Sequence, residues 1–420
     1  MRESASLRTL AVGALLLSAC SDPSDPAAPN EPDLAAVAAR QGPADDPNAL
    51  AGAVPGFGGF FYDQGVPTMY LKGPADRSRA ERALEPYLRK RGHSASSLKV
   101  RPGAFGWAEL EEWRNLATPE VLAEAGAVFI DADEASNRVR VGVERGGQGR
   151  IQAALQRAGI PAAAVIVDET EPVRFAVGDP KPKAKPGGGA SLQGLVRPIV
   201  GGVQINFPGF LCTLGFNVGG GSGSFITNSH CTNVQGGDEN TQYWQPLQST
   251  DPTVIAVEAA DPGYSSSLAG CPAGRVCRRS DASRAAYNSG IQFTLGRIAK
   301  TQRPRRSDLT ITGNFTITGE GSVAAGQTVN KVGRTTGWSQ GQVTQTCVNT
   351  NVSGTNITQL CQNFVSATVG SGDSGSPVFS IGGGDNVTLV GILWGGSGSR
   401  LFVYSPLTNV EQELGALTTH

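Results

Sequence analysis

A serine and a histidine stand in sequence contexts that suit nucleophilic catalysis. Ser374 lies in the string GDSG, where flanking glycines permit the sharp backbone turn that aims N–H groups at one point. The chain has three histidines, His93, His230 and His420, and only His230 follows a β-type run and precedes a cysteine. Acyl transfer by serine requires a hydroxyl, a base of near-neutral pKa and an acid that orients the base. We therefore interpret Ser374 as the nucleophile and His230 as its general base.

Longer stretches around these two residues carry a family resemblance. They are ITNSHC ending at residue 231, GDSGSPVF at residues 372–379, IVGG at residues 199–202, KVGRTTG at residues 331–337, GQV at residues 341–343 and GILWG at residues 391–395. In this order they resemble the chymotrypsin-like serine peptidases, in particular the bacterial branch that includes α-lytic protease and the streptogrisins. The resemblance covers about residues 195–420. It implies an all-β double β-barrel, hydrolysis of peptide bonds through an acyl-enzyme, and neither cofactor nor metal.

The resemblance also implies which residues complete the site. The family's chain order puts the acid between the histidine and the serine, and the context of Asp281 in CRRSDAS resembles the bacterial segment that carries it. Asp261 is the second candidate, although its Pro-Gly neighbours favour a turn. The oxyanion donors would be the N–H groups of Gly372 and Ser374. Asp373 would shape the oxyanion loop.

Specificity follows from the same comparison. The substrate-binding residues would be Thr368, Leu393, Trp394 and Gly395. Thr368 stands six residues before the nucleophile, where trypsin-like members carry the acidic residue that selects Arg or Lys. The domain has no second internal histidine of the kind that glutamate-selective relatives use. We therefore expect a small or apolar residue before the scissile bond.

Six cysteines in the second half of the chain predict disulfides. An even set in an exported chain favours oxidation, and the six fall into sequential couples with short loops. A zinc site is the weaker alternative, because there is no second CxxC half and there are few histidines. The expected pairs are Cys212–Cys231, Cys271–Cys277 and Cys347–Cys361.

The N-terminus has the pattern of an export signal. Arg2 and Arg8 precede a short apolar stretch that ends in the string LSAC, and the stretch is too short to span a membrane. The pattern resembles a bacterial lipoprotein signal, in which Cys20 is lipidated. The alternative is an ordinary cleaved signal with a chance cysteine. Either way we expect export, with the enzyme secreted or anchored to the outer or cell-surface membrane through Cys20.

Composition predicts the domain organisation. A Pro/Gly/Lys-rich run around residues 179–189 breaks every periodicity and separates two folded parts. In the first part, patterns predict a hairpin at residues 60–71, helices at 75–91, 105–122 and 148–158, with a break at Pro119, and strands at 126–130, 138–143 and 163–167. The predicted segments are a signal (1–19), a disordered tether (20–56), a small α/β pro-domain (57–173), a linker (174–193) and the protease domain (194–420).

The strand pair of the first domain is similar to pro-regions of the α-lytic type, which assist folding and inhibit their own protease. A separate binding module that stays attached is the alternative. Cleavage before Ile199 is disfavoured because Pro198 precedes it. We expect maturation between about Arg174 and Val196, with Asp373 held by neighbouring groups instead of a new N-terminus.

Several other functions are less consistent with the sequence. A net charge of −1 without a long basic run gives no reason to expect nucleic acid as a partner. An α/β-hydrolase has its nucleophile before its histidine, the reverse of the order here. A surface lipoprotein with an inactive protease-like domain remains the main alternative. The prediction is thus an exported serine endopeptidase, made as a zymogen, that acts on proteins or peptides.

Overall fold

The computed structural model describes residues 47–73, 77–176, 190–304 and 308–420. The export signal and the lipidation predicted at Cys20 lie outside these ranges. Within them, no helix combines the length and the apolar character needed to cross a membrane.

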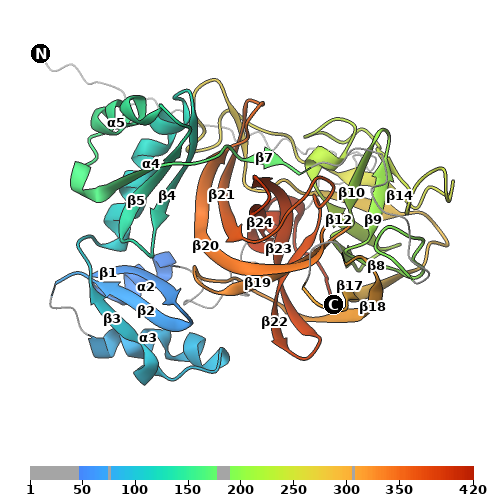
Figure 1. The fold of residues 1–420 in the computed structure, drawn as a ribbon, viewed down its shortest axis with the longest axis horizontal. Helices are drawn as coiled ribbons and strands as arrows, with labels where there is room; N and C mark the ends of the chain where they lie inside the picture. The colour runs from blue at the N-terminus through green and yellow to red at the C-terminus, as the bar shows by residue number, and fades with distance from the viewer. Residues whose placement is uncertain (1–46, 74–76, 177–189, 305–307) are drawn as a thin grey trace, which may run out of the picture. The chain divides into compact units, whose positions relative to one another are not determined.

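The first domain contains one three-stranded sheet, three further strands that continue the large sheet of the second domain, and the helices that cover them (Figure 1). The three-stranded sheet has the order β1-β2-β3, and among the further strands β5 lies between β4 and β6. The elements are α2 (Pro47–Ala53), β1 (Phe57–Asp63), β2 (Val66–Leu71), α3 (Arg77–Lys90), β3 (Lys99–Pro102), α4 (Trp107–Leu122), β4 (Ala127–Asp133), β5 (Arg138–Val143), α5 (Gln148–Arg157) and β6 (Val165–Glu169).

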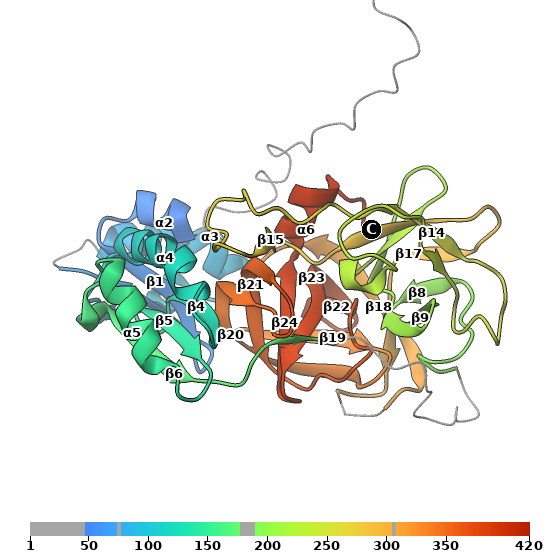
Figure 2. The ribbon, with the colours of Figure 1, turned by 90° about the horizontal axis from the view of Figure 1, so that it is seen from above.

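Helical periodicity explains how this domain closes. Ile151, Ala154 and Leu155 recur at helical spacing and are buried, which gives α5 one apolar face. Helices α4 and α5 pack together and lie over the sheet β4-β5-β6 (Figure 2). The predicted hairpin, helices and strand pair are confirmed within a few residues.

Two expectations for this part of the chain are wrong. The end of the segment predicted as a disordered tether forms the helix α2. This helix is ordered because Leu50 is buried in the core of the first domain. Helix α4 continues through Pro119 without a break. Proline removes one N–H donor from a helix interior, but residues on both sides of Pro119, among them Ala117, Thr118, Val121 and Leu122, are buried, and this packing holds the helix.

The first half of the protease domain is a curved antiparallel sheet. Its strand order is β11-β12-β16-β14-β13, and the pair β9-β10 joins it through a bridge between Asn206 and Trp244. The strands are β9 (Gln204–Phe207), β10 (Phe210–Thr213), β11 (Phe216–Val218), β12 (Ser224–Thr227), β13 (Gln242–Tyr243), β14 (Ala256–Ala260) and β16 (Ser283–Tyr287).

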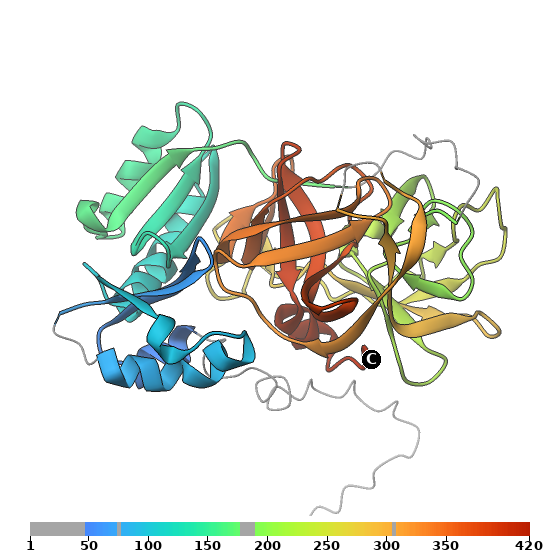
Figure 3. The ribbon, with the colours of Figure 1, turned by 60° about the horizontal axis from the view of Figure 1, so that its bottom comes forward.

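The second half closes into a barrel (Figure 3). Each strand pairs with the next in the cyclic order β19-β20-β21-β24-β23-β22, and β22 pairs back with β19. The strands are β19 (Thr328–Gly333), β20 (Gly337–Asn351), β21 (Ile357–Ser366), β22 (Pro377–Gly383), β23 (Asn386–Ser397) and β24 (Leu401–Pro406), followed by α6 (Leu407–Leu414). Further strands β8 (Ile199–Gly201), β15 (Val276–Arg278), β17 (Phe293–Thr301) and β18 (Ile311–Glu320) attach to this sheet. The predicted all-β character of this domain is confirmed.

Backbone pairing joins the first domain to the barrel. Strand β4 runs antiparallel to β20, with Ile130 opposite Asn349 and Phe129 opposite Thr350. The segment predicted as linker is shorter than expected at both ends: β7 (Arg174–Phe175) pairs with β23, and Leu192 is buried. Main-chain hydrogen bonds and burial, which composition does not report, account for both differences.

Candidate active site

The Ser374 turn depends on two glycines with positive φ. Gly372 has φ 97° and Gly375 has φ 89°, a backbone region that disfavours residues with a Cβ. A Cβ on Gly375 would also lie 2.0 Å from the Thr213 carbonyl oxygen. The turn between β21 and β22 therefore holds Ser374, which is fully buried, against the first half of the domain.

His230 contacts both of its predicted partners. It lies in a short 3₁₀ turn, Ser229–Cys231, that follows β12. Its Nε2 is 2.7 Å from the Ser374 Oγ, and its Nδ1 forms a short hydrogen bond with the Asp281 Oδ2. When the Nδ1 proton is directed at Asp281, Nε2 is free to accept a hydrogen bond from the Ser374 hydroxyl. The three side chains thus form one continuous chain of hydrogen bonds.

Asp281 is fully buried but well supplied with donors. The Tyr264 hydroxyl donates to its Oδ1 at 2.9 Å, the Gln235 side chain at 3.2 Å and the His230 backbone N–H at 3.3 Å. Burial opposes ionisation, yet His230, Arg278 and Tyr264 outweigh it and hold the pKa of Asp281 below its ordinary value. The group beside the histidine is therefore a carboxylate at neutral pH.

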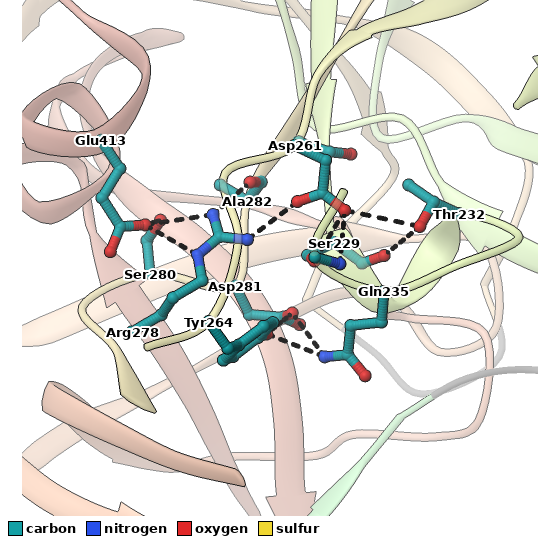
Figure 4. A network of polar contacts seen from close by, with 12 residues as sticks. Ser229, Thr232, Gln235, Asp261, Tyr264, Arg278, Ser280, Asp281, Ala282 and Glu413 are labelled. Atoms are coloured by element: carbon teal, nitrogen blue, oxygen red, sulfur yellow. Dashed lines mark hydrogen bonds and ion pairs between the residues drawn. The ribbon is translucent and has the colours of Figure 1, made fainter. Parts of the chain in front are cut away.

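Asp261, the second candidate for the acid, lies in a different network (Figure 4). Its Oδ2 accepts from the Ser229 hydroxyl and the Gly236 N–H, both at 2.9 Å, and its Oδ1 accepts from Arg278 at 2.8 Å. Burial raises the pKa of Asp261, although Arg278 opposes the shift. Asp261 braces the backbone on either side of His230 and does not orient the imidazole.

Arg278 ties several segments together behind the acid. It donates to Asp261, to the Ala282 carbonyl at 2.7 Å and to Glu413 at 3.1 Å, and its guanidinium lies 5.1 Å from the Tyr264 ring centroid (Figure 4). Burial lowers the pKa of Arg278, but its acidic neighbours reverse this and the net pKa is raised. Sequence reasoning assigned no role to Tyr264, Gln235 or Arg278, because nothing in the local sequence signals these contacts.

A buried cation balances Asp373 in the turn. The Lys331 ammonium lies 2.8 Å from the Asp373 Oδ2, and both side chains are fully buried. The Oδ2 also accepts from the Thr336 hydroxyl at 2.6 Å, and the Oδ1 from the Thr335 N–H at 3.0 Å. Ile199, for its part, donates its N–H to the Gln292 carbonyl at 2.9 Å. Lys331 therefore supplies the positive charge beside Asp373, as the expectation that neighbouring groups hold Asp373 requires, and sequence reasoning assigned no role to Lys331.

The predicted oxyanion donor already contacts a carbonyl group. The Gly372 N–H donates to the Ala176 carbonyl at 2.5 Å. The Ala176 N–H in turn donates to the Trp394 carbonyl at 3.1 Å, which also lies 3.2 Å from the Ser374 Oγ. Ala176 is therefore hydrogen-bonded to two main-chain groups next to Ser374, those of Gly372 and Trp394, and Phe175 stacks on His230.

The other predicted substrate-binding residues take different positions. Gly395 pairs with Phe175 in the sheet, whereas the Leu393 carbonyl accepts the Gly375 N–H at 2.8 Å. Thr368 is half-buried, and its carbonyl accepts the Ser339 hydroxyl at 3.0 Å. A hollow of about 350 Å³ is lined by Arg174, Phe175 and Ala176 and by the residues that follow Thr368, Val369 to Ser371.

The six cysteines are joined as Cys212–Cys231, Cys271–Cys277 and Cys347–Cys361. In the described part of the chain, one group could offer three metal-ligating atoms: Cys212, His230 and Cys231. Its two sulfurs are bonded to each other, and metal ligation requires thiolates. The group is therefore a disulfide beside the base.

No family model and no curated protein sequence matches the chain. Several solved structures are similar to it. Protease A of Thermobifida fusca has 22% identity and a TM-score of 0.40 over 53% of this chain and 99% of its own. Cellulomonas bogoriensis chymotrypsin has 21% identity and a TM-score of 0.38, and the alpha-lytic protease homolog N4 has 19% and 0.38, each over 53% of this chain and 99% of its own. Each of these similarities covers about half of this chain.

Proposed function

We propose that this chain is an exported serine endopeptidase that hydrolyses peptide bonds through an acyl-enzyme. The observation that carries the proposal is the hydrogen-bonded chain Asp281–His230–Ser374 beside a backbone N–H that already binds a peptide carbonyl. Each component that acyl transfer needs is present within hydrogen-bond reach of the next.

The mechanism follows from these contacts. His230 takes the proton of Ser374 as the Oγ attacks a substrate carbonyl carbon, and Asp281 stabilises the imidazolium that forms. The N–H groups of Gly372 and Ser374 bind the oxyanion. His230 then protonates the leaving amine. Water next attacks the ester carbon and gives a proton to His230, which passes it to the Ser374 Oγ as the ester bond breaks.

The preferred substrate has a small or apolar residue before the scissile bond. The wall that the protease domain contributes beside the oxyanion donor carries the apolar or uncharged residues Val369, Gly370 and Ser371, while Glu171 and Arg174, which line the same hollow, belong to the segment before Ala176. Burial of a charged side chain against such a wall would cost several kcal/mol without a partner.

Three disulfides support export into an oxidising compartment. Lipidation at Cys20 belongs to the same proposal. The first domain would act as the protease's own pro-region, a folding aid and inhibitor, since it is docked on the barrel through β4 and β20. The alternative, an inactive surface binding module, is disfavoured because a binding site has no need of a complete proton relay.

The test is mutation of the relay in the full-length chain. Ser374→Ala and His230→Ala should each lower kcat for casein hydrolysis by about 10⁴-fold or more. His93→Ala is the matched control, because His93 packs near Tyr62 in the first domain. Turnover of the Ser374→Ala variant at the wild-type rate would refute the mechanism.

A further inference from the structure

Residues 173–176 lie in the candidate active site, with the short strand β7 (Arg174–Phe175) at their centre. Arg174 pairs with Gly396 and Phe175 with Gly395 in antiparallel register, and the Ala176 N–H donates to the Trp394 carbonyl. The Val173 carbonyl accepts the Ser353 N–H at 2.8 Å, which anchors the other end of the segment. Addition of an extended segment to a strand edge is a common way to hold a peptide by its main chain.

The Ala176 carbonyl is placed as the carbonyl of a reacting peptide bond would be. Its oxygen accepts the Gly372 N–H, and Gly372 stands two residues before the nucleophile. The N–H of the same residue is bonded to the carbonyl oxygen that also contacts the Ser374 hydroxyl. The main-chain groups on both sides of the Ala176 Cα are therefore held by neighbours of Ser374.

The side chains of the segment fit their surroundings. The Phe175 ring stacks on the His230 imidazole, with centroids 4.3 Å apart and planes 27° apart, and meets Trp394 edge-on at 5.7 Å. The Ala176 methyl belongs to a buried apolar cluster that includes Val343 and Val369. Stacking shields the imidazole from water, and the cluster accepts a small apolar side chain.

The opposite strand leaves room for this segment only because it carries glycine. A Cβ on Gly395 would lie 2.6 Å from the Arg174 carbonyl oxygen, closer than real Cβ contacts allow. The close approach of β7 to β23 therefore depends on the glycine at residue 395.

We propose that the precursor cleaves itself at the Ala176–Val177 bond, and that the cleft prefers the sequence Val-Arg-Phe-Ala before the scissile bond. This inference rests on the proposed protease function and adds the identity of the bond and of the substrate residues. Val177 lies outside the described residues, and the assignment rests on the Ala176 carbonyl.

The chemistry is balanced with water as the co-reactant. The Ser374 Oγ bonds to the Ala176 carbonyl carbon, its proton passes through His230 to the Val177 nitrogen, and the C–N bond breaks. Water then adds to the ester carbon and gives a proton to His230. The bond between that carbon and the Ser374 Oγ breaks, and His230 returns the proton to Oγ. The products are a chain that ends in the Ala176 carboxylate and an enzyme that begins at Val177.

The new carboxylate keeps the hydrogen-bonding partners that its carbonyl has now. Because Val173 and the domain before it are anchored on the barrel, the cut segment stays in the cleft as a bound product. Cleavage alone therefore leaves the enzyme inhibited until the first domain is removed.

The first test is N-terminal sequencing of the enzyme secreted from full-length wild type and from Ser374→Ala. We expect Val177 at the mature terminus of wild type and no cut in the variant. A mature terminus at any other residue, in a preparation that hydrolyses casein, would overturn this inference and leave the protease function intact. Loss of casein hydrolysis and of labelling by a fluorophosphonate would instead refute the function itself.

The second test changes the residue before the bond. Ala176→Asp should slow self-cleavage at least about 100-fold, because the charge would enter an apolar cluster. Ala163→Asp is the matched control, since Ala163 is an exposed alanine of the first domain, and it should process like wild type.

A peptide assay covers the case in which the Ala176→Asp variant does not fold. Mature wild-type enzyme should hydrolyse acetyl-Val-Arg-Phe-Ala p-nitroanilide with a kcat/KM at least about 100-fold above that of the same peptide ending in Asp. Equal values for the two peptides, from an enzyme active on casein, would contradict the assigned preference.

Discussion

At the scale of single residues, two buried aspartates near His230 have separate tasks. Asp281 is bonded to the imidazole, whereas Asp261 is bonded to Ser229, Gly236 and Arg278. Both are buried carboxyl groups with several donors, so burial alone does not distinguish them. Their hydrogen-bond partners distinguish them, because only a carboxylate that accepts the His230 Nδ1 proton can select the imidazole tautomer that catalysis needs.

We therefore expect Asp281→Asn and Asp261→Asn to differ in kind. Asp281→Asn should lower kcat by about 10⁴-fold with a small change in stability, since the amide can favour the wrong histidine tautomer. Asp261→Asn should cost a few kcal/mol of unfolding free energy, because it leaves the buried Arg278 with less compensation, and should lower kcat far less. Steady-state kinetics and urea unfolding of the same preparations measure both effects. The reverse ranking in kcat would move the acid to Asp261.

At the scale of elements, the Ser374 turn is held by an ion pair between β19 and the turn itself. Burial lowers the pKa of Lys331, and the Asp373 charge opposes that shift. Each charge is therefore stable in the interior only beside the other. A buried pair of this kind contributes little net stability, but removal of one partner leaves an uncompensated charge.

Lys331→Met should accordingly destabilise the domain by about 3–5 kcal/mol. Urea unfolding in a Ser374→Ala background avoids self-digestion during the measurement. Lys300→Met is the matched control, because Lys300 pairs with Asp385 at the surface and such pairs contribute about 1 kcal/mol or less. Equal losses from the two lysine variants would contradict the role assigned to Lys331.

At the scale of the whole molecule, two acidic side chains lie where the first domain meets β20. The Gln345 amide donates to Asp131 at 2.8 Å, and the Thr346 hydroxyl donates to Glu134 at 2.7 Å. One oxygen of each carboxyl group is buried without a hydrogen-bond partner among the described residues. Burial, followed by repulsion from neighbouring carboxylates, raises the pKa of both groups well above the ordinary values. Asp133, Glu111 and Arg114 act on Asp131, and Asp131 and Asp133 act on Glu134.

Docking of the first domain should therefore weaken as pH rises. Separation would expose both carboxyl groups to water and return each pKa to about 4, so docking takes up protons. The stabilisation is complete below pH 4 and is lost as pH rises through the raised pKa values, at up to about 1.4 kcal/mol per pH unit for each group.

Hydrogen exchange of full-length Ser374→Ala measures this dependence. Protection of the paired segments 129–130 and 349–350, corrected for intrinsic exchange, should be lower at pH 8 than at pH 5. The double variant Asp131→Asn, Glu134→Gln should lose the pH dependence, while Glu112→Gln, an exposed change on α4, should keep it. An unchanged dependence in the double variant would show that other groups control docking.

The sequence by itself determined the parts of this protein that local patterns encode. The strings around Ser374 and His230 identify a nucleophile and a base, because glycine turns and a lone histidine beside a cysteine are local signals. Period-2 and period-3.6 patterns likewise predict β4, β5 and α5. Tertiary structure decided the rest. Lys331 and Asp373 are 42 residues apart, Tyr264 and Asp281 are 17 apart, and Phe175 of the predicted linker stacks on His230 of the protease domain. Hydrogen bonds, desolvation and stacking act over a few ångströms in space, so partners distant in sequence become visible only when the chain is folded.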